Sequence, residues 1–244
     1  MRDFGANRYI PLDSRSLNGH RALLEKKIIS IENLSVKYKS TKALSKINIT
    51  IDRGEFLFLI GPSGAGKTSL LKVISQELSP SEGRIIMFPL TREGNKPFCT
   101  NVYQDLSLVP EWTCMDNFKV SYDPKIYSSK KSFYDNLSEL INVFGLEEKL
   151  LLKVSELNGG AKQQVGVIRA LLSKPDILLA DEPTSSLDLD NVKRLYEVFN
   201  FYNMKRGTTI IWATHQQNLI SNFNGRIIKL NKGHLVGTGE KCFI

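Results

Sequence analysis

The chain has 244 residues, of which 41% are hydrophobic, and it carries a formal net charge of +8. This composition suits one large domain or two closely packed lobes and excludes a chain that is disordered throughout. A basic surface could face nucleic acid, an anionic membrane or solvent. Because the Lys and Arg residues are scattered and form no block, we expect a solvated basic surface.

Neither the cysteines nor the hydrophobic runs indicate an exported or membrane-spanning chain. Cys99, Cys114 and Cys242 lie far apart without a C-x-x-C pair, so we expect no disulfide framework or metal site, and a reducing compartment fits. The first residues lack the apolar core of a secretory signal. The longest apolar run, residues 56–60, falls far short of the roughly 20 residues that cross a bilayer. At a membrane, another chain would have to supply the span.

Strand patterns dominate the first part of the chain. Residues 1–26 are polar and weakly patterned, which predicts an N-terminal extension outside the core. Residues 28–36 and 47–51 alternate between apolar and polar side chains, as in half-buried strands. After a D-R-G-E turn, F-L-F-L-I at 56–60 is apolar throughout, which predicts a strand buried on both faces.

Helices and strands alternate in the rest of the chain, which predicts an α/β fold with a largely parallel sheet. Residues from about 105 to 157 lack strong strand patterns and contain a helical pattern at 132–144. We therefore expect a mostly helical insertion in the α/β core. The remaining expected elements are helices at 67–76 and 189–205, strands at 84–88, 177–181, 208–214 and 226–230, and a hairpin-like turn at 231–234.

A phosphate-binding loop is predicted at residues 61–68, G-P-S-G-A-G-K-T, between a buried strand and a helix. Its glycines allow a tight loop whose N–H groups, with the helix N-terminus, attract phosphate. Lys67 adds a full charge for the β- and γ-phosphates, and the Thr68 hydroxyl can ligate Mg²⁺. The candidate residues here are Gly61, Pro62, Ser63, Gly64, Ala65, Gly66, Lys67, Thr68 and Ser69.

Two acidic residues follow the predicted strand at 177–181, in I-L-L-A-D-E-P. Asp181 can hold Mg²⁺ directly or through water, and Glu182 can polarise a water for attack on the γ-phosphate. The carboxyl ends of parallel strands meet at one edge of a sheet. We therefore expect this pair to lie beside the phosphate loop.

Smaller motifs follow in an order that resembles the ABC-type ATPases, over roughly residues 28–240. They are Tyr38 in V-K-Y-K, Gln104 in N-V-Y-Q-D, L-N-G-G-A at 157–161, S-S-L-D at 185–188, and His215 in A-T-H. The resemblance implies a P-loop core with an N-terminal antiparallel β subdomain. It also implies a single domain over 27–244, with a core lobe at 27–104 and 158–244 and a helical subdomain at 105–157.

The resemblance also assigns roles to these residues. Tyr38 would stack on adenine, Gln104 would contact Mg²⁺ and the attacking water, and His215 would hold the γ-phosphate and that water. Asp188 would cross the interface of an ATP-sandwich homodimer, in which Asn158, Gly159 and Gly160 of one subunit cover the nucleotide of the other. No N-K-x-D motif for guanine is present, which favours ATP. The catalytic candidates are Glu182, His215 and Gln104, and the Mg²⁺ candidates are Thr68, Gln104 and Asp181.

The signature segment, residues 157–161, departs from the family pattern L-S-G-G-Q. Asn158 stands in place of the Ser and Ala161 in place of the Gln. The two glycines still let backbone N–H groups approach a phosphate, whereas the altered side chains weaken or slow closure. Two hypotheses stay open: a retuned ATPase, or a nucleotide-binding module that does not hydrolyse ATP.

A single compact cassette of this family docks on a separate membrane protein, and it has no room for the long insertions of the nucleic-acid members. We therefore expect no nucleic-acid partner, and a peripheral location on the cytoplasmic side of the inner membrane. Docking is predicted near residues 105–120, where Trp112, Met115 and Phe118 are either anchors or core residues of the helical part. Finer resemblance favours the cell-division members, with an FtsX-type membrane subunit. Lipoprotein-releasing and macrolide-export ATPases are the alternative.

Overall fold

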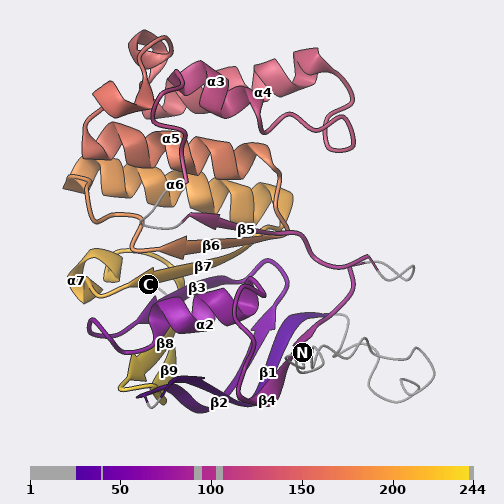
Figure 1. Ribbon diagram of the computed structural model, residues 1–244, viewed down its shortest axis with the longest axis vertical. Coiled ribbons are helices and arrows are strands. Elements are labelled where there is room, and N and C mark those ends of the chain that lie inside the picture. Colours follow the sequence, from indigo (N-terminus) through magenta and orange to yellow (C-terminus); the bar gives the residue numbers. More distant parts are fainter. Residues whose placement is uncertain (1–25, 40, 91–94, 103–106, 242–244) are drawn as a thin grey trace.

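Figure 1 shows the computed structural model of the chain, which describes residues 26–39, 41–90, 95–102 and 107–241. Within these ranges the first sheet is antiparallel and three-stranded, in the order β2-β1-β4. This sheet confirms the N-terminal antiparallel β subdomain. Its strands are β1 (Lys27–Tyr38), β2 (Thr41–Asp52) and β4 (Glu82–Met87).

The second sheet is six-stranded within the described residues, in the order β5-β6-β7-β3-β8-β9. Its first five strands pair in parallel, and β9 is antiparallel to β8. The predicted, mainly parallel sheet is thus confirmed. Its strands are β3 (Phe56–Ile60), β5 (Cys99–Val102), β6 (Ile177–Asp181), β7 (Thr209–Thr214), β8 (Gly225–Asn231) and β9 (His234–Lys241).

Helices cover both faces of this sheet. Figure 1 shows α2 on one side, α6 and α5 stacked on the other, and α3 and α4 beyond α5. The α-helices are α2 (Lys67–Ile74), α3 (Cys114–Lys119), α4 (Lys130–Phe144), α5 (Gly159–Leu172), α6 (Leu189–Arg206) and α7 (Gln217–Ile220), with short 3₁₀ helices at Glu147–Lys149 and Val154–Glu156. Among the residues described, no helix is long and apolar enough to cross a membrane.

Strand β3 shows why the central strands are apolar throughout. Phe56 and Phe58 belong to the hydrophobic cluster shared with α5 and α6, whereas Leu57 and Leu59 belong to the cluster shared with α2 and the β1–β2 strands. Successive side chains of a strand point to opposite faces, so a strand between two helical layers buries both sets. The whole strand is buried, as the sequence predicted.

Two strands were not predicted from the sequence. Strand β5 has the sequence C-T-N-V and lies at the edge of the sheet, so its polar residues mask the strand pattern. Strand β9 contains two glycines, which weaken a strand signal. Residues 1–25 and Gln104 lie outside the described residues, and the division into a core lobe and a helical subdomain stays a prediction.

Candidate functional site

The loop at residues 61–66 joins β3 to α2 and is held tightly by neighbouring backbone. Gly66 has φ 104°, and a Cβ there would lie 2.7 Å from the carbonyl oxygen of Ala43 in β2. A Cβ at Gly61 would overlap the carbonyl oxygen of Leu230 in β8. Only glycine therefore fits at these two positions. The loop is fixed between two strands, with its N–H groups ahead of the N-terminus of α2.

Lys67 is buried, and its ammonium turns back over this loop. Its Nζ donates to the carbonyl oxygens of Gly61 at 2.8 Å and Pro62 at 3.3 Å. The same Nζ lies 3.4 Å from Oε1 of Glu182, which follows β6. Salt screens a buried ion pair of this kind much less than an exposed one.

Glu182 leaves the strand in a strained conformation, with φ 49°, and its N–H donates to the carbonyl oxygen of Ala213 in β7 at 2.9 Å. Left-handed backbone at a non-glycine residue is costly and concentrates at functional sites. In this conformation the Glu182 carboxylate lies beside His215. Nδ1 of His215 is 2.9 Å from Oε1, and the backbone N–H of His215 donates to Oε2 at 3.3 Å. Lys67 and His215 thus meet at one carboxylate.

The register of the sheet explains this convergence. Strand β7 lies between β6 and β3, with Asp181 opposite Ala213 and Ile60 opposite Thr214. Because the three strands are parallel, their carboxyl ends reach the same edge of the sheet. The expectation that the acidic pair lies beside the loop is therefore met by the geometry.

Asp181 has the properties of a cation ligand. The residue is 6% exposed, and burial raises the pKa of its carboxyl, whereas a hydrogen bond with the Thr68 side chain opposes that rise. Its Oδ1 is buried and has no hydrogen-bond partner among the described residues. A buried carboxylate oxygen without a partner is unfavourable unless a cation binds it. Thr68 and Asp181 therefore fit the predicted Mg²⁺ site.

Tyr38 ends β1 at the side of the phosphate loop. It pairs with Thr41 across the β1–β2 turn, and the next residues of β2, Ala43 and Leu44, lie against Gly66. Its side chain is 45% exposed. The stacking of Tyr38 on adenine stays a prediction.

The signature segment lies at the N-terminus of α5, which begins at Gly159. The Asn158 side chain caps this helix, accepting from the N–H of Ala161 at 2.9 Å. Ala161 itself is buried in the core. A Cβ at Gly159 would lie 3.3 Å from Cβ of Ser186, and one at Gly160 would lie 3.3 Å from the carbonyl oxygen of Ser186. The glycines therefore have a packing role that sequence analysis missed.

Ser186 belongs to the D-loop segment, residues 185–188, whose last residue caps α6. Asp188 Oδ1 accepts from the N–H of Asn191 at 2.8 Å, and its Oδ2 accepts from the Asn191 side chain at 2.9 Å. The backbone hydrogen bond from Asn191 is the main cause that lowers the pKa of Asp188. Asn191 and its other partner, Gln164, were not predicted, because the contact between them joins two helices and has no local sequence signal.

The predicted docking region divides into surface and core. Trp112 is exposed and lines a cavity of about 360 Å³ with Asp116, Lys119 and Val120. Met115 is partly buried against the core. Phe118 is fully buried, so of its two predicted roles, docking anchor or core residue of the helical part, the structure supports the second. Gln104 lies outside the described residues, so its place relative to Glu182 stays a prediction.

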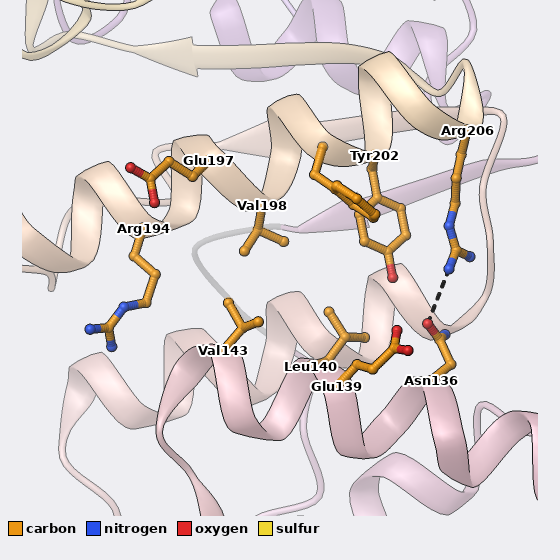
Figure 2. A pocket seen from close by; sticks show the side chains of 10 residues that line it. Asn136, Glu139, Leu140, Val143, Arg194, Glu197, Val198, Tyr202 and Arg206 are labelled. Atoms are coloured by element: carbon orange, nitrogen blue, oxygen red, sulfur yellow. Dashed lines mark hydrogen bonds between the residues drawn. The ribbon is translucent and has the colours of Figure 1, made fainter.

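A second hollow separates α4 from α6 and contains none of the predicted site residues. Figure 2 shows its apolar middle, between Val143 and Leu140 on α4 and Val198 on α6. At one end the Arg206 guanidinium donates to Oδ1 of Asn136 at 3.2 Å. The volume of this hollow is about 380 Å³. Charges of both signs line it, from Glu139, Glu197, Arg194 and Arg206.

The profile of the ABC transporter family matches residues 44–185, which contain the phosphate loop, the signature segment and the acidic pair. The chain belongs to the ABC transporter family. It is an ABC-type ATPase, a nucleotide-binding subunit with the fold of the ATP-binding cassettes. A 26% identical relative of known structure is the ATP-binding cassette MJ0796 in a dimeric, post-hydrolysis state bound to ADP and Pi. It matches with a TM-score of 0.77 over 88% of this chain and 100% of that chain.

Two kinds of curated relative match the chain at similar identity. The cell division ATP-binding protein FtsE of Bacillus subtilis is 33% identical over 208 residues, which are 80% of this chain and 88% of the relative. The spermidine/putrescine import ATP-binding protein PotA of Fusobacterium nucleatum is also 33% identical, over 88% of this chain. The matched part is only 58% of that relative's length.

Proposed function

We propose that this ABC-type ATPase binds Mg-ATP in an ATP-sandwich homodimer and hydrolyses it to drive a membrane complex. The observation that carries the proposal is the convergence on Glu182. Its carboxylate meets the Lys67 ammonium at 3.4 Å and the His215 imidazole at 2.9 Å. A general base for the attacking water and a cation for the phosphates, held close together, are features that support γ-phosphate hydrolysis.

Each residue then has a distinct task. The loop N–H groups and Lys67 hold the β- and γ-phosphates, and Tyr38 stacks on adenine. The Glu182 carboxylate accepts a proton from the attacking water, and His215 orients that carboxylate and the water. Thr68 and Asp181, with Gln104 expected beside them, would hold Mg²⁺. When bound, the cation neutralises phosphate charge that would otherwise repel the attacking oxygen.

The partner subunit completes the site in this proposal. Asn158, Gly159 and Gly160 of one subunit cover the phosphates held by the other, and Asp188 crosses the interface. The capping hydrogen bond uses the side-chain oxygen of Asn158. The groups left to donate to a phosphate are therefore its amide Nδ2 and the backbone N–H groups of the signature segment. This arrangement supports a retuned ATPase over a module that cannot hydrolyse ATP.

The membrane partner is proposed from the docking cavity and the relatives. The cavity beside Trp112 has an apolar wall and one charge of each sign, Asp116 and Lys119, which suits an amphipathic segment of an integral membrane subunit. Resemblance to FtsE favours an FtsX-like partner and a role in cell division, at the cytoplasmic face of the membrane. The PotA relative, at equal identity, supports an import complex as the second candidate.

The decisive experiment is the Glu182→Gln variant with light scattering and a phosphate-release assay. We expect turnover to fall about 100-fold or more, because the general base is lost, while ATP binding stays and Mg-ATP doubles the mass in solution. Glu148→Gln, on an exposed 3₁₀ helix, is the matched control and should behave as wild type. Unchanged turnover in Glu182→Gln would refute the ATPase mechanism.

The identity of the complex is tested separately by co-purification from membranes. A cell-division role predicts recovery of a single FtsX-like subunit. Trp112→Ala should reduce that recovery, because it removes an exposed aromatic side chain that lines the docking cavity. Recovery of import permease subunits instead would support the second candidate.

A further inference from the structure

The side chain of Asn191 joins two helices and uses all its polar groups. Its Nδ2 donates to Oδ2 of Asp188 at 2.9 Å, and its Oδ1 accepts from Nε2 of Gln164 on α5 at 3.1 Å. An ionised carboxylate can only accept hydrogen bonds, so Asp188 fixes which end of the Asn191 amide faces it. These hydrogen bonds, here called the polar tie, therefore have one self-consistent arrangement.

The polar tie lies on the same face of α5 as the close glycine contact. Gly160 and Gln164 are four residues apart in a helix, so they occupy one face, one turn apart. Gly160 meets the D-loop segment at Ser186, where a Cβ would be 3.3 Å from the carbonyl oxygen. Gln164, which is 8% exposed, meets the start of α6 at Asn191. The first two turns of α5 are thus attached to the D-loop segment and its helix at two successive points.

We propose that Asn191 is a positioning residue that makes the signature segment and the D-loop segment move as one unit. The inference rests on the proposed homodimer, because these are the two segments that such a dimer directs at the partner's nucleotide. Donors aligned before binding cost less to order than donors that must be ordered during closure. With the Asn158 oxygen engaged in capping, the alignment of the signature N–H groups depends on this unit.

The polar tie is tested first in the free subunit by hydrogen exchange of the full chain. Asn191→Ala removes the amide, so exchange in the first turns of α5 should speed up about tenfold, although the substituted residue lies in α6. Asn142→Ala removes an exposed asparagine of α4 and should change nothing in α5. Unchanged exchange in α5, or equal acceleration throughout the chain, would overturn the proposal.

A swap of the two partners provides the rescue. Asp188→Asn together with Asn191→Asp exchanges donor and acceptor, so the new carboxylate still accepts from Gln164 and from the new amide. Asparagine also remains a good N-cap for α6. The swap should return α5 exchange to within about twofold of wild type, while Gln164→Met, which keeps the shape but removes the donor, should not. Failure of the swap to restore protection would contradict the pairing.

A functional readout distinguishes positioning from general stability. In the Glu182→Gln background, Asn191→Ala should weaken ATP-driven dimerisation about tenfold and leave nucleotide affinity of the monomer unchanged. Equal dimerisation with and without the polar tie would overturn its positioning role. If Glu182→Gln alone does not dimerise, the proposed homodimer fails, and the hydrogen-exchange result by itself decides whether the two segments are coupled.

Discussion

The phosphate-loop side and the signature side of this protein are built by different means. On the phosphate-loop side, side chains that follow three parallel strands converge, with Glu182 between Lys67 and His215. On the signature side, the polar side chains of Asn158 and Asp188 cap their own helices, so in the proposed dimer backbone N–H groups would face the partner. Changes of side chain should therefore be costly on the first side and tolerated on the second, unless they disturb packing.

The largest expected effect of a single substitution on binding is that of Lys67→Met, on the phosphate-loop side. It removes a buried charge that donates into the loop, so ATP affinity should fall about 100-fold. Titration with a fluorescent ATP analogue measures this loss. Lys131→Met on α4, at an exposed position, is the control and should bind normally. Affinity within twofold of wild type would show that the loop backbone alone holds the phosphates.

On the signature side, a packing change should matter as much as loss of the polar tie and more than a change of the Asn158 side chain. Gly160→Ala adds a Cβ 3.3 Å from the carbonyl oxygen of Ser186, so α5 must shift away from the D-loop segment. We expect ATP-driven dimerisation in the Glu182→Gln background to weaken about tenfold, with monomer affinity unchanged. Gly237→Ala, where a Cβ meets nothing within 4 Å, is the matched control. Normal dimerisation of Gly160→Ala would mean that the glycine contact is dispensable.

The smallest effect is expected from Asn158→Ser, which restores the side chain of the family pattern. Serine and asparagine cap helices about equally well, so thermal stability should not change and turnover should change only a few-fold. Asn158→Ala removes the cap and should cost about 1 kcal/mol of unfolding free energy, measured by denaturant titration. A large gain in turnover for Asn158→Ser would show that Asn158 limits the enzyme through its phosphate contact rather than serving as a neutral cap.

The central strands, the phosphate loop and the acidic pair could be predicted from the sequence, because each has a recognisable pattern of neighbouring residues. The apolar run of β3, the following G-P-S-G-A-G-K-T loop and the acidic pair after β6 each have a signal within a few residues. Strand β5 has no such signal, because an edge strand buries little side-chain surface and can therefore consist of polar residues. Phe118 was ambiguous for the opposite reason: an aromatic residue in a helix is equally suited to a core or to a docking surface.

The sequence by itself determined the parallel core, the phosphate loop and the acidic pair, because spacing along the chain fixes which residues follow the carboxyl end of a strand. The roles of Gln104 and His215 came from the resemblance to the ABC-type ATPases. Only the tertiary structure decided that Glu182 meets Lys67 and His215, since the strand order β6-β7-β3 is not written in the chain order. The same holds for Gly160 against Ser186 and for Gln164 against Asn191. Contacts between separate elements depend on how helices pack over the sheet, which no local pattern records.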